Sequence, residues 1–486
     1  MMDQWNIIEW LTYQQDSPLL FTQRYFWVFF ALVMGGYSVV YKHTARRNLF
    51  LFLVSLFFYY KSSGPFLGLF ALMIISDYLF ALLIQKKSGT TRKLLLWLSL
   101  SYSLSFLLYF KYANFFIHNC NELFGTQFTD HNLFLPIGIS FYTFQSISYL
   151  MDVYRNEIPA SKNVSDYAFY MTFFPHLVAG PIVRAKDFLP QIVNPQPINA
   201  ALYKESLLRI MSGLLKKLFI ADYIGKYVDI VHELPQNFSG AENLLAMYGY
   251  SFQIYFDFSG YSDIAIGIAL MLGYRLKENF ENPYTSTNVT VFWRKWHISL
   301  SSWLKDYIYI PLGGNRKGEF NTYLFLLITM LVGGFWHGAD WRFVFWGLAH
   351  GLALAFHKAW RQLFPKENNS HWTRIASTAI TFHFVAFCWI FFRATSFGSA
   401  FASIEQIVFH TKWQDFTGFW DSRREMGILL FIATIIAFFP PKIKEKLFQE
   451  IQILPTFTWI LWMTIALQII IQFKDDVVQP FIYFQF

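Results

Sequence analysis

The chain reads FWRKWHISLS at residues 292–301 and GGFWHGADW at residues 333–341, so two histidines, His297 and His337, each directly follow a tryptophan. Both stretches belong to a very apolar polypeptide, and ionisable side chains are costly to keep at membrane depth. A hydrophobic chain that retains two imidazoles in such surroundings indicates a functional use for them. The two stretches are therefore the first candidates for a functional site.

The composition predicts an all-α, polytopic membrane protein in one integral-membrane domain. Of 486 residues, 55% are hydrophobic and only 14% are charged, and the mean hydropathy is +0.33. Stretches without Asp, Glu, Lys or Arg approach or reach the roughly 20 residues that a crossing helix needs. They are residues 25–41, 94–110, 133–151, 167–183, 320–339, 375–392 and 451–473. Shorter apolar runs bring the total to about ten to twelve helices or re-entrant segments.

The excess of basic residues is interpreted as a topology signal. The net charge is +8 and the pI about 9.1, but Lys and Arg mark cytoplasmic loops in membrane chains, so we predict a lipid bilayer and no nucleic acid as partner. Basic residues follow the first and third spans, at 42–47 and 86–93, whereas residues 62–64 and 118–131 have none. This pattern places the amino terminus outside. Residues 1–23 lack the features of a cleavable signal, so the first span is expected to direct insertion.

Three regions differ in character. Residues 1–118 are interpreted as a helical scaffold, residues 133–400 as the catalytic core and residues 427–474 as carboxy-terminal helices. The core region contains apolar runs broken by proline and glycine, which are tolerated at membrane depth where protein or a water-filled cavity satisfies the backbone. The amphipathic segment 204–220 is predicted either to lie along the membrane interface or to form a short buried helix with snorkelling lysines.

His337 has the surroundings of a general base. The glycines beside it allow close helix approach, and Trp336 and Trp341 can wall the ring with apolar surface. Such burial favours the neutral imidazole that a base needs. Asp340 can orient the ring if the segment is helical, or it is an interfacial charge. The alternative for His337 is an interhelical hydrogen-bonding histidine.

Other polar groups have structural alternatives. His297 lies among Arg294, Lys295 and Lys305, which is also typical of an interfacial anchor. Asp257 and Asp263 are expected to meet basic or hydroxyl partners on other helices, rather than to act as catalytic acids. The loop at residues 313–318 is predicted to bind phosphate or to form a simple basic turn.

Several familiar catalytic patterns are missing from the sequence. It contains no Gly-x-Ser-x-Gly elbow, no His-Glu-x-x-His pair and no Walker lysine loop, and we predict no metal site. Cys120 and Cys388 allow at most one disulfide, and Cys388 lies in an apolar run where a buried small hydrophobe is expected.

Taken together, the ordered motifs of the core region closely resemble the membrane-bound O-acyltransferase superfamily. The resemblance is to its bacterial branch, which contains the alginate O-acetylation membrane protein, peptidoglycan O-acetyltransferase and the D-alanyl transfer protein of teichoic acid synthesis. It rests on residues 292–318, GFWHG at 334–338 and FWGLAHG at 345–351, and further on LPIGISFYTFQ at 135–145, FFPHLVAGPI at 173–182, YFDFSGYSD at 255–263 and WIFFRA at 389–394.

The resemblance implies a helical membrane fold around a tunnel, with the essential histidine of the superfamily at His337 and a second site position at His297. It implies O-acyl transfer, with acetyl favoured by the form of the motif around His337, for O-acetylation of an exported polysaccharide such as alginate or another cell-surface glycan. His337 is then expected to be the general base toward the accepting hydroxyl or itself a transient acyl carrier. His297 is expected to polarise the acyl carbonyl or to orient His337. The expected substrate-binding or donor-binding residues are Asp306, Asn315, Arg316 and Trp336.

The same resemblance implies the surroundings of the reaction. The donor is expected to be an acyl-CoA, with acetyl-CoA favoured, used as a substrate without any tightly bound cofactor. The location is the bacterial plasma membrane, and the partner an extracytoplasmic hydrolase-like acetyltransferase. The alternatives are D-alanyl transfer to teichoic acid from a carrier-protein thioester, transport of a lipid-linked saccharide, and a scaffold for polymer export. A transporter favours inverted-repeat halves, which the sequence does not display.

Overall fold

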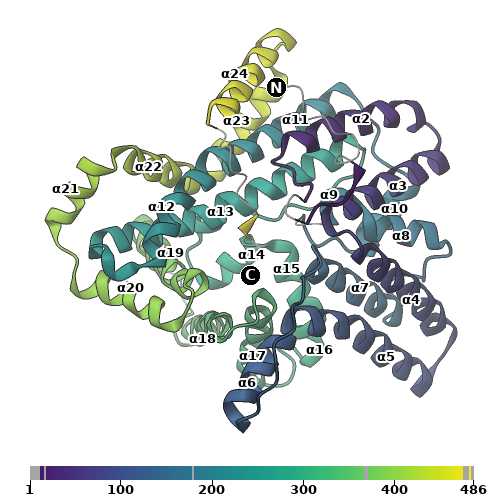
Figure 1. The fold of residues 1–486 in the computed structure, drawn as a ribbon, viewed down its shortest axis with the longest axis horizontal. Coiled ribbons are helices and arrows are strands. Elements are labelled where there is room, and N and C mark those ends of the chain that lie inside the picture. The colour runs from purple at the N-terminus through teal and green to yellow at the C-terminus, as the bar shows by residue number, and fades with distance from the viewer. Residues whose placement is uncertain (1–10, 16–17, 178–179, 366–369, 474–480, 483–486) are drawn as a thin grey trace. The chain divides into compact units, whose positions relative to one another are not determined.

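The computed structural model describes residues 11–15, 18–177, 180–365, 370–473 and 481–482. Every regular element within these residues is a helix, with short 3-10 and π segments among them (Figure 1). The predicted all-α fold is therefore confirmed. The expectations for residues 1–23 and for the motif at 173–182 fall partly outside the described residues.

The chain divides into two compact units, and the first comprises Met1–Ser206 and Ala265–Lys277. Its helices are α2 (Arg24–Val40), α3 (Thr44–Ser63), α4 (Phe66–Lys86), α5 (Gly89–Leu107), α6 (Ala113–Phe124), α7 (Ile139–Tyr154), α8 (Val164–Thr172), α9 (Phe174–Leu177) and α10 (Ala185–Val193). Helices α11 (Ala200–Leu214) and α13 (Gly240–Met271) contribute residues to both units.

The second unit comprises Leu207–Ile264 and Glu278–Phe486. Beyond α11 it contains the π segment η2 (Leu215–Ala221) and α12 (Asp222–Glu233), and then α14 (Val289–Lys295), α15 (Ile298–Leu304), the π segment η5 (Lys305–Tyr309) and α16 (Ile310–Leu312). The remaining helices are α17 (Glu319–His337), α18 (Trp341–Leu363), α19 (His371–Arg393), α20 (Phe397–Phe409), α21 (Trp413–Ser422), α22 (Arg424–Phe438), α23 (Pro441–Ile453) and α24 (Thr456–Phe473).

Four helical stretches among the described residues are long and apolar enough to cross a membrane: Phe66–Lys86, Gly89–Phe124, Glu319–His337 and His371–Arg393. Helices α22 and α23 together are also long and apolar enough, and they count as a fifth crossing if they form one broken span. The chain bends by 94° between them, at Pro440 and Pro441. Three shorter apolar helices are α2, α20 and most of α24. The tunnel and the three-region division of the chain stay predictions.

The core of the first unit contains buried carboxyl groups, and that of Asp77 connects three helices. Asp77 of α4 accepts hydrogen bonds from the Ser103 hydroxyl of α5 at 3.3 Å and from the Tyr167 hydroxyl of α8 at 3.1 Å. Arg47 of α3 is also buried and donates to the carbonyl of Ile192 at 2.7 Å. Polar side chains therefore connect the helices of this apolar unit.

The acids of α13 are paired, as expected. Lys217, only 2% exposed, forms ion pairs with Asp257 and, at 2.7 Å, with Asp222. Asp263 meets Lys216 at 2.5 Å and lies 4.0 Å from Arg209. Both interpretations of segment 204–220 are wrong for Lys217, because its ammonium group turns inward to carboxylates and not outward to an interface.

Lys217 is predicted to stabilise the second unit more than either acid that it binds. Lys217→Met removes both ion pairs, whereas Asp257→Asn removes one and keeps the pair with Asp222. Breaking a buried pair costs about 3–5 kcal/mol, so Lys217→Met should lower the melting temperature in detergent further than Asp257→Asn does. Exposed Lys442→Met in the same unit is the control. Equal melting temperatures for all three variants would contradict the prediction.

Candidate functional site

Helices α17 and α18 meet backbone to backbone. A Cβ atom added at Gly334 would lie 2.3 Å from the carbonyl oxygen of Phe343, and one at Gly347 would lie 2.4 Å from the carbonyl oxygen of Met330. Only residues without a side chain allow such an approach, which is a common way for apolar helices to pack. The glycine pair that precedes His337 is therefore a helix contact, as predicted.

The turn between these helices fixes the position of His337. Helix α17 ends at His337, and the Asp340 carboxylate caps α18 by accepting a hydrogen bond from the Arg342 backbone N–H at 2.8 Å. The same carboxylate also binds the Arg342 guanidinium at 2.9 Å. Asp340 therefore caps a helix and pairs with Arg342, and the expectation that it orients the His337 ring is wrong.

His337 is enclosed by aromatic rings. It is 4% exposed, and its ring centroid lies 5.0 Å from that of Trp336, 5.1 Å from that of Trp346 and 5.2 Å from that of Phe392. Trp336 and Trp346 were quoted in the motifs above, and Phe392 comes from the motif at 389–394. The ring is therefore enclosed by aromatic side chains from three helices.

His297 is buried as completely as a core residue. It is 0% exposed, and its ring meets Phe258 edge-on at 4.6 Å between centroids. The interfacial interpretation of this residue is therefore wrong. Its backbone φ of 43° lies in the left-handed region, which residues other than glycine seldom adopt and which is concentrated at functional sites.

Asn279 sets the tautomer of His297. The Asn279 Oδ1 atom accepts hydrogen bonds from the Ser299 backbone N–H at 3.2 Å and from the Ser299 hydroxyl at 2.9 Å, so it is an acceptor. It also lies 3.1 Å from the Nδ1 atom of His297, which must then donate its proton. Burial lowers the pKa of His297 to about 3, so the ring is neutral and its lone pair lies on Nε2.

The two histidines share one aromatic neighbour. The ring of Trp336 lies 5.0 Å from that of His337 and 6.3 Å from that of His297, measured between centroids. The fold thus brings together residues that are far apart in the sequence and that come from α17 and from the start of α15. Trp336, predicted as a substrate-binding residue, forms part of the wall between them.

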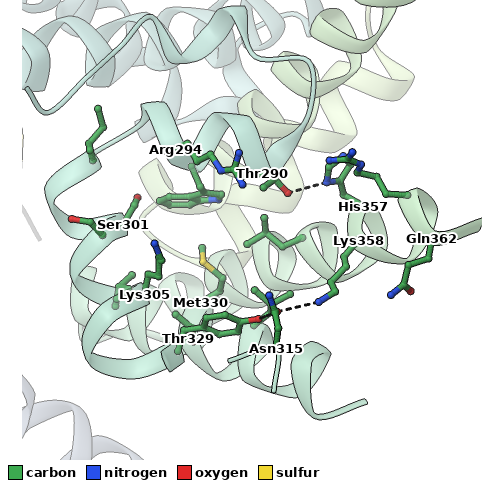
Figure 2. A pocket seen from close by; sticks show the side chains of 18 residues that line it. Thr290, Arg294, Ser301, Lys305, Asn315, Thr329, Met330, His357, Lys358 and Gln362 are labelled. Carbon is green, nitrogen blue, oxygen red and sulfur yellow. Dashed lines mark hydrogen bonds between the residues drawn. The ribbon is translucent and has the colours of Figure 1, made fainter. Parts of the chain in front are cut away.

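A cavity of about 720 Å³ is walled mainly by helices α14, α15, α17 and α18 (Figure 2). Its described lining includes Ile298, which follows His297 in the chain, but not His297, His337 or Trp336. Its cationic lining residues are Arg294, Lys305, Lys358 and Arg361. None of the residues that line it in the described chain is Asp or Glu. Trp293 and Leu304 add apolar surface. A cavity with this lining favours an anionic ligand that also has an uncharged part.

One predicted donor-binding residue lines the cavity. Asn315 Oδ1 accepts from Lys358 Nζ at 3.2 Å and from the Tyr309 hydroxyl at 2.5 Å (Figure 2). Arg316 is exposed in the turn at residues 313–318, and Asp306 is half-buried in η5. Neither of these two residues lines the cavity. The roles of all the predicted site residues stay predictions.

Other residues of the site were missed. Asn279 gave no local signal, because it lies in an irregular segment 18 positions before His297. Lys358 and Arg361 belong to none of the motifs quoted above, so the sequence did not single them out. His350 and Trp293 stood in motifs quoted for the resemblance, which was a usable signal that they have a role.

Comparison with known proteins identifies similar chains over most of the length. The model of the membrane-bound O-acyltransferase family matches residues 7–401. The "Probable alginate O-acetylase AlgI" of Pseudomonas aeruginosa is 42% identical over 407 residues, 81% of this chain and 76% of that protein. The peptidoglycan O-acetyltransferase of Helicobacter pylori is 38% identical over 423 residues, 80% of each chain. The teichoic acid D-alanyltransferase of Bacillus subtilis is 31% identical over 283 residues, 55% of this chain and 71% of that protein.

Gly347→Ala is predicted to disrupt the hairpin that holds His337. The new methyl group would lie 2.4 Å from a backbone oxygen that cannot rotate away, so the helices must separate. Overpacking of this kind costs about 1–3 kcal/mol, which should lower the melting temperature in detergent. Gly68→Ala in α4 is the matched control, since nothing lies within 4 Å of a Cβ there. An unchanged melting temperature for Gly347→Ala would contradict the close contact.

Proposed function

We propose that this chain, which belongs to the membrane-bound O-acyltransferase family and is an acyltransferase of the membrane, transfers an acetyl group for the O-acetylation of an exported polysaccharide. The observation that carries the proposal is the pair of buried imidazoles, His297 and His337, that share the ring of Trp336. A cationic cavity in the same unit, lined in part by Ile298 next to His297 in the chain, supports it. Neutral histidines in a site that excludes water suit proton transfer at a reacting hydroxyl.

The relatives support acetyl as the transferred group and a glycan as the acceptor. The alginate O-acetylase and the peptidoglycan O-acetyltransferase, at 42% and 38% identity, match about 80% of this chain. The D-alanyltransferase of Bacillus subtilis is 31% identical over 55% of this chain. Alginate or another cell-surface glycan is therefore the proposed acceptor, and D-alanyl transfer to teichoic acid is the second candidate.

The cavity supports an acyl-CoA donor, and we take acetyl-CoA as the substrate. The phosphate groups of acetyl-CoA are bound best by cations. Arg294, Lys358 and Arg361 supply positive charge in the cavity, and no carboxylate in the described lining opposes it. The pantetheine arm is uncharged and suits the apolar wall around Trp293. Asn315, held by Lys358, is proposed to contact the donor within the same cavity.

The proposed chemistry is acyl transfer from sulfur to oxygen. His337 takes the proton of the accepting hydroxyl, the oxygen attacks the acetyl carbonyl, the C–S bond breaks, and the leaving thiolate receives the proton from His337. In the second route a nitrogen of His337 attacks the acetyl carbonyl, the C–S bond breaks, and the thiolate takes the proton that the acetylated ring loses. The hydroxyl oxygen then attacks the acetyl-imidazole, the C–N bond breaks, and the hydroxyl proton returns to the ring. Both routes give the same ester and the same thiol.

The tautomer of His297 favours one of its two predicted roles. A neutral ring that donates from Nδ1 to Asn279 presents only a lone pair at Nε2, so it can accept a hydrogen bond but cannot donate one to a carbonyl oxygen. We therefore propose that His297 orients His337 or the attacking hydroxyl, and that it does not polarise the acyl carbonyl.

The cellular arrangement is proposed as follows. The chain lies in the bacterial plasma membrane with its amino terminus outside, the donor enters from the cytoplasm, and the acetyl group leaves on the opposite side. An extracytoplasmic hydrolase-like acetyltransferase is the proposed partner that completes transfer to the glycan. The names of the acetylating relatives, an alginate O-acetylase and a peptidoglycan O-acetyltransferase, support a glycan as the final acceptor.

The histidine variants test the reaction. His337→Ala should reduce ester-linked acetate on the surface polysaccharide by at least about 100-fold, the usual contribution of a general base, and His297→Ala should reduce it by a smaller factor. Membrane levels of each protein are measured alongside, and exposed His410→Ala is the control. Normal acetate in both variants would contradict the proposal; ester-linked D-alanine in the native strain would favour the second candidate, and its absence would favour transport or a scaffold.

The cavity cations are predicted to bind the donor phosphates. With purified protein, Lys358→Gln combined with Arg361→Gln should raise the KM for acetyl-CoA at least about 10-fold, because two charge-assisted contacts are lost. The KM for S-acetyl-pantetheine, which has no phosphate, should change little. Exposed Arg374→Gln is the control. An equal change in KM for both donors would show that these cations do not bind phosphate.

A further inference from the structure

His350 of α18 is a third buried histidine, and its ring has a defined partner. It is 0% exposed, and its Nδ1 atom accepts a hydrogen bond from the Trp293 indole Nε1–H at 3.2 Å. An indole nitrogen can only donate, so Nδ1 has the lone pair and the proton of this ring lies on Nε2. The contact joins α18 to α14, 57 residues apart in the sequence.

The rings around His350 form a continuous layer from the cavity to His337. Trp293 lines the cavity and lies 5.2 Å from the His350 ring, measured between centroids. Trp346 lies 4.7 Å from His350, 5.1 Å from His337 and 5.6 Å from Trp293. His350 therefore contacts both the tryptophan that walls the cavity and the tryptophan that walls the candidate base.

The backbone beneath His350 is fixed as well. A Cβ atom added at Gly351 would lie 3.1 Å from the Leu327 side chain and 3.2 Å from its Cα atom, so α18 lies directly against α17 here. On the other side Phe384 of α19 packs edge-on against the His350 ring at 5.4 Å. Packing on two sides leaves the imidazole little freedom to turn, so it can hold the Trp293 indole in one orientation.

We propose that His350 is a positioning residue. It holds the indole rings of Trp293 and Trp346 in fixed orientations, so that the thioester of the donor lies next to His337. This inference rests on the proposed function, since it requires the cavity to bind a thioester donor. His350 touches neither donor nor acceptor and acts only through the two indoles. Its loss should misplace the acetyl group while the cations that bind the phosphates remain, so kcat should fall and KM should not.

The test compares two side chains at position 350 in purified protein with acetyl-CoA. His350→Leu removes the acceptor, and we expect kcat to fall about 10-fold to 100-fold, as for a misplaced reactant, with KM within about 2-fold of the native value. His350→Asn places an amide oxygen near the position of Nδ1 and should recover much of the loss. Exposed Trp360→Phe on the same helix is the control.

The partner residue gives an independent test. Trp293→Phe keeps an aromatic wall but has no N–H, so it should lower kcat to a similar extent, and adding His350→Leu should cause little further loss. Each variant must retain the native melting temperature. If His350→Leu does not fold, the test instead compares the kcat of Trp293→Phe with that of Trp293→Phe combined with His350→Asn. Subtracting the ultraviolet resonance Raman spectrum of Trp293→Phe from that of the native protein isolates the signal of Trp293. Its indole band should have the frequency of a hydrogen-bonded N–H.

The outcomes separate the two proposals. Equal loss in His350→Leu and His350→Asn, a change in KM alone, or additive loss in the double variant would overturn the positioning role. An unchanged kcat in His350→Leu, with acetyl transfer intact in the native protein, would contradict that role and leave the proposed function standing. A native protein that transfers no acetyl group from acetyl-CoA would instead contradict the proposed donor.

Discussion

The contact between Gly334 and Gly347 is the constraint on which the candidate site depends. Because neither residue has a side chain, α17 and α18 approach until the backbone of one meets the backbone of the other. The short turn between them then leaves His337 beside Trp346, in a position set by backbone geometry. Larger residues would separate the helices and, with them, the aromatic walls of the imidazole.

Aromatic packing determines the chemistry available to the histidines. Rings from three helices surround His337, and the same kind of packing buries His297 and His350. In surroundings of low polarity a charged imidazole is unfavourable, and burial lowers the pKa of His297 to about 3. Asn279 and Trp293 then decide on which nitrogen of His297 and His350 the lone pair lies.

Charge is distributed differently in the interior and in the cavity of the second unit. Inside, Lys217 is neutralised by two carboxylates, whereas the cavity gathers cations with no carboxylate in its described lining. The first arrangement stabilises the fold, and the second keeps positive charge available for a ligand. Basic residues in one sequence thus have opposite uses, according to whether the fold gives them acidic neighbours.

The sequence by itself determined the all-helical membrane class, the family, the two histidines and the pairing of the α13 acids. Composition and hydropathy depend on single residues, and each motif is a short continuous stretch. All three can therefore be interpreted without a structure. Only the tertiary structure decided that Asn279 binds His297, that Asp340 caps a helix beside Arg342, and that Asn315 lines the cavity while Arg316 does not. These are contacts between or at the ends of helices, and hydropathy specifies which segments become helices but not which of their faces meet.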